Sequence, residues 1–389
     1  MSALRHLDAE LERLKSAGLL RTPRESLPDD TLVLCSNDYL GYAREPLHSV
    51  APSGAGASRL ISGDKSEHRA LESAIARWLE CDAVLVFSSG YAAGLGAVAA
   101  LAGPDDLVVS DELNHASLID GCRLSRARVA VVPHLSADAV ANALEREPTS
   151  TRNWVVTESY FSMDGNSPDL AALRRICDAH DAALVVDEAH ALGVFGARGR
   201  GLCHAANVVP DVLIGTLGKA LGTQGAFVAG SRALRSWLWN RARSFVFSTG
   251  LSPALANMAT ARVERAAADD EARARLHAIC LRVRRELARM RVPIADSHGP
   301  VIPWLVGDAG AAVTLSRALL EHGVFVQAIR PPTVPPGSAR LRLSLHARLG
   351  DEEIARLLTA VERVMQRPKL GEHASADRKC SPRAPDQRA

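Results

Sequence analysis

The sequence predicts an α/β protein with a mostly parallel sheet covered by helices, followed by a smaller α+β domain. Short apolar runs alternate with helical patterns between residues 83 and 216, as in a series of β–α units. Polar side chains follow the ends of several of these runs. From about Pro253 the alternation gives way to long charged helices and then to short apolar segments.

The composition argues against several classes of protein. The net charge of +2 over 389 residues gives no support for nucleic acid or an anionic membrane as a partner. The seven cysteines include no C-x-x-C pair, which disfavours a zinc knuckle or a disulfide framework and favours a reducing cytoplasm. The first 16 residues are charged throughout, unlike a signal peptide, and no apolar run is long enough to span a bilayer. We therefore expect a cytoplasmic protein without a metal, nucleic acid or membrane.

The first element is an amphipathic helix, which Gly18 ends. Its apolar residues recur at helical spacing: Leu4, Leu7, Leu11 and Leu14. We expect this helix to lie across the body of the protein or a partner subunit. A short strand at residues 32–35 follows and leads into a polar cluster at 36–41.

A loop of small residues at 54–63 precedes the next helix. Asp64 is expected to cap this helix, because Glu67 lies three residues later, as in a capping box. A buried strand at residues 83–87 then runs into small residues and a helix that ends near Leu101.

The start of the helix after residues 83–87 is a candidate phosphate site. Backbone N–H groups are free there, and the helix dipole is positive. Gly90 and Tyr91 lie at this point of the chain. Tyr91 fits either a residue that stacks on a ring or a core tyrosine.

Further strands and helices alternate along the chain. Strands are expected at residues 107–110, 129–132, 154–157, 182–187 and 212–214, with helices at 136–146 and 169–180. Polar residues follow the carboxyl ends of these strands, where α/β sheets bind ligands. These residues are His115, Ser162, Asp187, His190, Thr216 and Lys219.

Lys219 lies in an apolar, glycine-rich stretch at residues 212–222 that contains no acidic residue. Burial would shift this amine toward its neutral form, which can form a Schiff base with an aldehyde. A lysine that extends from a surface loop into solvent is the alternative. Asp187 can keep a pyridine nitrogen protonated, and His190 can lie against an aromatic ring. The two stretches together supply the lysine and the acidic partner that pyridoxal phosphate (PLP) requires.

The C-terminal part has short apolar segments at 301–306, 324–327 and 340–345, and helical patterns at 311–322 and 351–366. A rigid, proline-rich loop spans residues 329–337. Arg342 lies among alternating apolar residues, where a guanidinium needs an anionic partner. That partner is either a substrate carboxylate or an internal salt bridge.

Four segments of the chain resemble motifs of the α-oxoamine synthases, a branch of the fold-type-I PLP enzymes. They are SNDYLG at 36–41, FSMDG at 161–165, DEAH at 187–190 and GKALG at 218–222. The resemblance covers residues 1–367 and implies a seven-stranded, mostly parallel sheet. Segment 328–335 (AIRPPTVP) favours the member of the family that joins L-alanine to a pimeloyl thioester in biotin biosynthesis. Segment 54–59 (GAGASR) departs from members richer in glycine, so contacts to the acyl chain stay open.

The resemblance also implies a division of the chain. Residues 1–45 would join the small domain, 46–275 would form the large PLP-binding domain, and 276–367 the small α+β domain. Residues 368–389 are expected to be a disordered tail, because they are polar, rich in proline, serine and arginine, and without periodicity.

The resemblance implies that Lys219 carries PLP and that Asp187 pairs with the pyridinium nitrogen. His115 would stack on the ring, and His190 and Ser162 would lie around its phenolic oxygen.

For the phosphate group, the resemblance implies contacts from Gly90, Tyr91 and Thr216. Ser248 and Thr249 would reach the same phosphate from the partner subunit. The enzyme would therefore be a homodimer with its active site at the subunit interface.

Substrate contacts follow from the same resemblance. Arg342 and Asn37 would bind the amino-acid carboxylate, and Arg21, Thr333 and His115 match further substrate-binding positions. The acyl donor would be a thioester of coenzyme A or of an acyl-carrier protein.

Three other functions fit parts of the sequence. One is a sibling enzyme that condenses glycine with a short acyl-CoA, such as 2-amino-3-ketobutyrate CoA ligase or 5-aminolevulinate synthase. Its amino acid lacks the methyl group of L-alanine, and one methyl group changes the binding free energy by only ~1–3 kcal/mol. A PLP-binding regulator without turnover is disfavoured by the retained lysine, aspartate and histidines. An RNA helicase, suggested by the letters at 187–190, needs a phosphate loop, but Ala220 follows Lys219 and Leu213 stands where that loop requires glycine.

Overall fold

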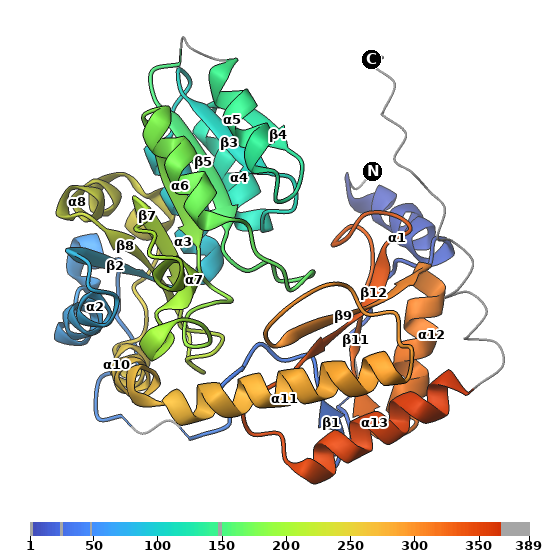
Figure 1. The fold of residues 1–389 in the computed structure, drawn as a ribbon. Coiled ribbons are helices and arrows are strands. Elements are labelled where there is room, and N and C mark those ends of the chain that lie inside the picture. Colours follow the sequence, from blue (N-terminus) through green and yellow to red (C-terminus); the bar gives the residue numbers. More distant parts are fainter. Residues whose placement is uncertain (1–2, 24–25, 47–48, 147–149, 367–389) are drawn as a thin grey trace.

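The computed structural model describes residues 3–23, 26–46, 49–146 and 150–366. Its main feature is a seven-stranded sheet (Figure 1) with the strand order β2-β8-β7-β6-β5-β3-β4. The strands are β2 (Ala83–Phe87), β3 (Leu107–Asp111), β4 (Arg128–Val132), β5 (Asn153–Glu158), β6 (Ala182–Asp187), β7 (Val212–Thr216) and β8 (Ala226–Gly230). Only β8 runs antiparallel to its neighbours, β2 and β7. The predicted mostly parallel sheet is confirmed, and β8 is an addition to it.

Helices cover both faces of this sheet. One face packs against α3 (Gly90–Leu101), α4 (Ala116–Ser125), α8 (Arg232–Arg241) and α9 (Arg243–Val246). The other packs against α5 (Ala137–Glu145), α6 (Leu170–Ala179) and α7 (Gly201–Ala205). Side chains alternate between the faces, so Val156 of β5 and Val185 of β6 pack on the α3 side, whereas Val155 and Val186 pack on the α6 side.

Helix α2 (Ser66–Leu79) begins one residue later than the sequence suggests, and the prediction that Asp64 caps it is wrong. The carboxylate of Asp64 instead accepts a hydrogen bond from Nη2 of the buried Arg59 at 2.7 Å. His68, the third residue of the helix, accepts the backbone N–H of the N-cap residue Lys65 through Nδ1 at 3.0 Å. A buried guanidinium therefore takes the carboxylate that would have capped the helix.

The rest of the chain forms smaller sheets and long helices. In a three-stranded antiparallel sheet, β12 (Ala339–Ser344) lies between β11 (Gln327–Ile329) and β9 (Val301–Gly307). The N-terminal strand β1 (Leu32–Val33) pairs in parallel with β10 (Val324–Phe325). The helices are α10 (Pro253–Ala268), α11 (Asp270–Arg289), α12 (Ala309–Leu320) and α13 (Asp351–Met365). The boundaries of the large and small domains stay a prediction, and the tail expected at 368–389 lies outside the described residues.

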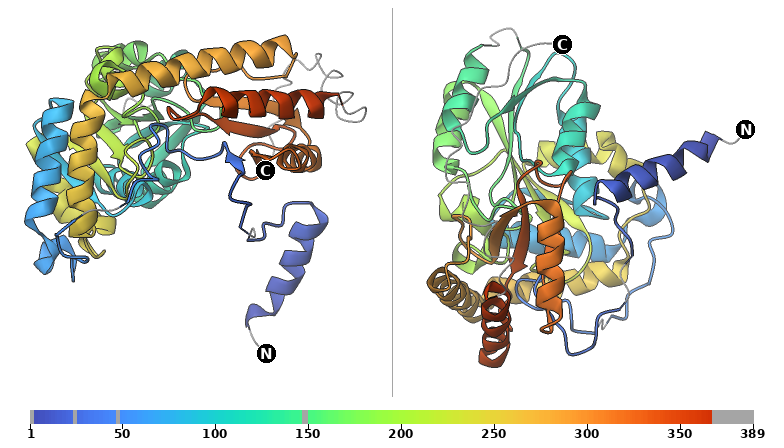
Figure 2. Two further views of the ribbon diagram at one scale, coloured as in Figure 1. Left: turned by 90° about the horizontal axis from the view of Figure 1, so that it is seen from below. Right: turned by 90° about the vertical axis from the view of Figure 1, so that its right-hand side faces the viewer.

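Helix α1 (His6–Ser16) follows a short 3₁₀ turn and has no buried residue. Figure 2 shows it projecting away from the seven-stranded and the three-stranded sheet. The predicted helix is confirmed, but its expected packing on the body of this chain is wrong, and packing on a partner subunit stays a prediction.

None of the helices in the described part of the chain combines the length and apolarity needed to cross a bilayer.

Candidate active site

Lys219 follows β7 by three residues, and Asp187 ends the neighbouring strand β6. The loop after β7 is held by a hydrogen bond from Leu217 N–H to the Gly225 carbonyl at 2.9 Å. Gly222 has a φ of +61°, and a Cβ there would lie 2.5 Å from the backbone nitrogen of Ala43. Only glycine fits this close approach, which brings the N-terminal segment against the lysine loop.

Burial lowers the pKa of Lys219 to about 8, while the charge of Asp187 raises it. The direction is the one that the apolar surroundings predict. Asp187 is 8% exposed, and its Oδ1 accepts the N–H of Ala189 at 2.8 Å. Burial raises the pKa of Asp187, whereas Lys219, the Ala189 N–H and His115 lower it. The two groups lie close enough for each to stabilise the charged form of the other.

A second cluster joins residues from both ends of the chain. Arg342 of β12 donates from Nη2 to Asn37 Oδ1 at 2.8 Å and to the Tyr39 hydroxyl at 3.3 Å. Its Nε donates to the Ser162 carbonyl at 2.5 Å. The Tyr39 hydroxyl lies 2.7 Å from His190 Nδ1. The structure thus brings together four of the predicted residues, with Tyr39 at their centre.

Arg342 is buried, yet across the described ranges no acidic side chain forms a salt bridge with it. Of the two partners left open by the sequence, the internal salt bridge is therefore excluded within these ranges. The neighbouring Arg340, on the same strand, pairs instead with Asp164. A buried guanidinium held only by neutral oxygens can bind an incoming carboxylate.

The predicted phosphate site lies at the start of α3. Ser89 caps this helix by accepting the Ala92 N–H at 3.2 Å. A Cβ added to Gly90 would lie 3.7 Å from Oγ1 of Thr216, so these two residues are adjacent. Thr216 Oγ1 itself donates to the Gly225 carbonyl at 3.2 Å.

Tyr91 and His115 have their rings near each other, with centroids 6.4 Å apart and planes at 73°. Tyr91 is 44% exposed, so the alternative of a core tyrosine is excluded. His115 is the N-cap of α4, where Nδ1 accepts the Ser117 N–H at 3.2 Å. Its ring is open to solvent, although the surrounding protein desolvates it enough to lower its pKa.

The remaining predicted residues lie in two other places. Arg21 donates from Nη2 to Thr333 Oγ1 at 3.0 Å, so the structure brings these two together. Ser248 and Thr249 lie in the loop between α9 and α10, beside Arg59. Within the described ranges, neither residue forms a hydrogen bond with Lys219 of the same chain, and Lys219 is not among the residues around them.

Two residues of the site are missing from the sequence-based set, Tyr39 and Glu158. Tyr39 lies inside the polar segment 36–41, but its partners are far away in the sequence. Glu158 ends β5 and is 4% exposed. The signal that marked Asp187, a polar side chain at the carboxyl end of a buried strand, also marks Glu158.

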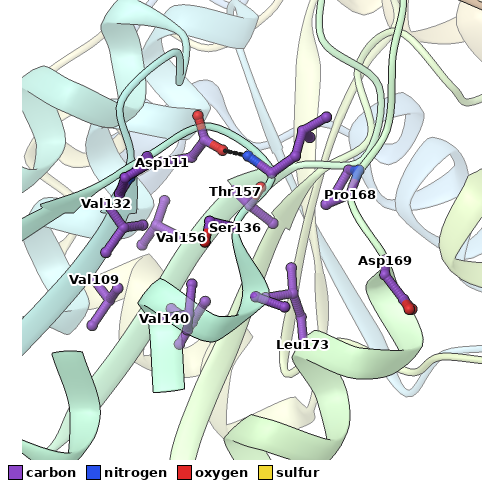
Figure 3. A pocket seen from close by; sticks show the side chains of 14 residues that line it. Val109, Asp111, Val132, Ser136, Val140, Val156, Thr157, Pro168, Asp169 and Leu173 are labelled. Atoms are coloured by element: carbon purple, nitrogen blue, oxygen red, sulfur yellow. Dashed lines mark hydrogen bonds between the residues drawn. The ribbon is translucent and has the colours of Figure 1, made fainter. Parts of the chain in front are cut away.

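A separate cavity of about 20 Å³ lies on the α5 and α6 side of the sheet (Figure 3). It is lined largely by apolar side chains, including Val109, Val140 and Leu173. Asp111 lies at its edge, where its carboxylate accepts the Leu135 N–H at 2.9 Å. The volume suffices for about one water molecule, so this cavity is not the cofactor site.

The fold and this arrangement define a PLP-dependent enzyme of fold type I. Lys219, Asp187 and the start of α3 lie around one edge of the sheet, and their chemistry fits the aldehyde, ring nitrogen and phosphate of PLP. The chain belongs to the aminotransferase class I and II family, whose model matches residues 29–361. Among the described residues, no group of three histidine, cysteine, aspartate or glutamate side chains could hold a metal ion.

Several curated relatives are similar to nearly the whole chain. The 8-amino-7-oxononanoate synthase of Anaeromyxobacter dehalogenans (strain 2CP-1) is 44% identical over 93% of this chain and 96% of its own length. The enzyme of the same name from Marinobacter nauticus is 43% identical over 92% of this chain and 96% of its own. That of Mycolicibacterium smegmatis is 45% identical over 88% and 92%.

Solved structures agree on the fold. The serine palmitoyltransferase of Sphingomonas wittichii has a TM-score of 0.86 and 30% identity, covering 94% of this chain and 97% of that one. The S. paucimobilis enzyme, with a PLP–myriocin adduct bound, has a TM-score of 0.87 and 26% identity, covering 94% and 98%. The 8-amino-7-oxononanoate synthase of Francisella tularensis has a TM-score of 0.72 and 24% identity over 86% of this chain and 98% of that one, which supports the fold alone.

Proposed function

We propose that this protein condenses L-alanine with a pimeloyl thioester in biotin biosynthesis, giving 8-amino-7-oxononanoate, CO2 and free thiol. Relatives of that name at 43–45% identity, which this chain matches along nearly all of its length, support the choice of reaction. The structural observation that supports the proposal is the environment of Arg342. Its buried guanidinium is bound to neutral oxygens only, and it belongs to the same hydrogen-bonded cluster as His190. This is a place for the carboxylate of an amino acid beside a PLP site.

Bound PLP supplies an electron sink for negative charge at the α-carbon of the amino acid. The protein's own residues position the groups around it. Lys219 Nζ would hold the cofactor, and as a free amine it would accept or return the proton at the α-carbon, because its pKa of about 8 leaves a neutral fraction near pH 7. Asp187 provides a negative charge at the ring nitrogen, which keeps that nitrogen protonated.

Substrate binding is assigned to the second cluster. Arg342 and Asn37 bind the alanine carboxylate, and Tyr39 orients His190 through the hydrogen bond at 2.7 Å. Arg21 and Thr333, already hydrogen-bonded to each other, contact the acyl substrate. Thr333 lies in the loop that carries segment 328–335, and Arg21 reaches it from the N-terminal segment, so the pair is a candidate for recognising the pimeloyl chain.

The proposal includes a cytoplasmic homodimer in which Ser248 and Thr249 complete the phosphate site of the partner subunit. None of the described cysteines forms a disulfide, which suits a reducing compartment. The acyl donor is a thioester of coenzyme A or of an acyl-carrier protein.

The test is release of free thiol by the purified protein with PLP. We expect release from L-alanine with pimeloyl-CoA or a pimeloyl acyl-carrier protein. Glycine with acetyl-CoA or succinyl-CoA, and L-serine with palmitoyl-CoA, serve as parallel reactions, and Lys219→Ala is the inactive control. Turnover only with glycine or serine would contradict the proposed substrate pair and favour a sibling activity. No thiol release in any reaction, despite bound PLP, would contradict the catalytic proposal itself.

A further inference from the structure

Glu158 and Asp187 lie beside each other on neighbouring strands of the sheet. They are paired in the register of the parallel strands β5 and β6, which they end. Two residues earlier, Val156 and Val185 both pack on the α3 side of the sheet, so the alternation of a strand directs Glu158 and Asp187 to that side as well. Neighbouring strands lie about 4.8 Å apart, which places the two carboxyl groups side by side.

Both carboxyl groups are buried, at 4% and 8% exposure. Two buried carboxylates at paired positions on one face of a sheet are not both ionised at neutral pH, because burial and their mutual repulsion favour a proton on one of them. The titratable groups that act on the pair are Lys219, His115 and Asp111. The question is which of the two carries the proton.

The surroundings favour the negative charge on Asp187. Its Oδ1 accepts the Ala189 N–H at 2.8 Å, and Lys219 is the charge that stabilises its ionised form most. For Glu158, burial and the charge of Asp187 both raise its pKa well above the usual range, against a weaker opposing effect of Lys219 and the His115 N–H. Glu72 is a useful contrast, because this buried glutamate pairs with Arg59 and Arg235.

We propose that Glu158 is the protonated member of a buried carboxyl pair and thereby keeps Asp187 anionic and in position. Glu158 is a positioning residue that acts through Asp187. The inference rests on the proposed function only in that the partner of Asp187 would be the ring nitrogen of PLP. The proton on Glu158 is a property of the protein without cofactor.

The first experiment is infrared spectroscopy of the apoprotein in deuterated buffer near neutral pH. The wild type minus Glu158→Gln difference is expected to show loss of the carbonyl stretch of a protonated carboxyl group. Glu72→Gln, the matched buried control, is expected to lose a carboxylate band instead. Glu188 is a further buried glutamate, but its contribution cancels in the difference spectrum. Loss of the protonated band in Asp187→Asn, but not in Glu158→Gln, would overturn the proposal.

The second experiment measures PLP affinity of the same variants, with folding checked by circular dichroism. Glutamine imitates a protonated glutamate, so Glu158→Gln is expected to bind PLP within about threefold of wild type, whereas Asp187→Asn weakens binding by roughly tenfold or more. Equal loss in both variants would overturn the proposal. A wild type that binds no PLP would contradict the proposed function, while the infrared result would still locate the proton.

Discussion

Burial lowers the pKa of Lys219 to about 8, against the opposing charge of Asp187. Compared with an exposed lysine, this raises the neutral fraction of the amine near pH 7 by roughly 200-fold. The sequence predicts the direction, since residues 212–222 are apolar and contain no acid. It does not reveal that the carboxylate of Asp187, on the neighbouring strand β6, limits the shift.

The rate at which PLP attaches to the apoprotein should therefore rise with pH and level off above about pH 8, because only the neutral amine attacks an aldehyde. Stopped-flow absorbance measures this rate, and borohydride reduction followed by peptide mapping identifies the lysine. Lys219→Ala should show no covalent attachment in this assay. A midpoint near that of an exposed lysine, about 10.4, would show that burial does not tune this amine.

Single residues also mark the limit of sequence-based prediction. Asp187 and Lys219 could be predicted because each follows a buried strand, and the position of a strand is a local property. Tyr39 could not, since its partners His190 and Arg342 lie far along the chain. The roles of the site residues stay predictions until the variants are measured.

Among the elements of the fold, the loop after β5 is held from two sides. Its Phe161 ring packs edge-on against His134 at 4.4 Å, and His134 Nε2 lies within hydrogen-bond distance of Asn166. On the other side, Arg342 binds the Ser162 carbonyl. His134 is itself bound through Nδ1 to Asp111 at 2.9 Å. A histidine–aspartate pair of the large sheet thus positions a loop that also contacts β12.

This pair should make the stability of the protein depend on pH. Burial alone would lower the pKa of His134, but the hydrogen bond and charge of Asp111 outweigh it, and the pKa is raised. A raised histidine pKa stabilises the fold fully below the unfolded value, about 6.5, and this stabilisation disappears as the pH rises through the folded value. His134→Gln should therefore lower the free energy of unfolding by about 1–3 kcal/mol near pH 6 and by less near pH 9.

Urea unfolding at the two pH values measures the difference for His134→Gln. His277→Gln, an exposed histidine on α11, is the matched control and should show no such dependence. An equal loss of stability at both pH values in His134→Gln would mean that packing against Phe161, rather than the ion pair, explains the effect.

For the whole molecule, the alternation of strands and helices predicts the class of fold, and most strands lie within a residue or two of their expected positions. The strand order could not be predicted, because it depends on pairing between distant segments. Strand β8 is too rich in small residues to stand out. The pairing of β1 with β10 joins near-opposite ends of the chain, which no local pattern reports.

The assembly can be tested by mixing two defective forms. Lys219→Ala and the double variant Ser248→Ala, Thr249→Ala should each have low activity at limiting PLP. If Ser248 and Thr249 serve the partner subunit, half of a random mixture is heterodimer with one intact site, and about a quarter of wild-type activity returns. Thiol release by the refolded mixture measures this recovery. No recovery above the sum of the parents would place these residues in the site of their own chain.

The pairing of β1 with β10 also sets an order for biogenesis. A ribosome makes about 5–20 residues per second, so Leu32 emerges many seconds before Val324, its partner in the register. Asn37 and Tyr39 wait equally long for Arg342. The central sheet and Lys219 can therefore form during translation, whereas the cluster of Asn37, Tyr39 and Arg342 is complete only when synthesis is nearly finished. On the proposed roles, the lysine for PLP would be in place in the nascent chain before the site for the amino acid.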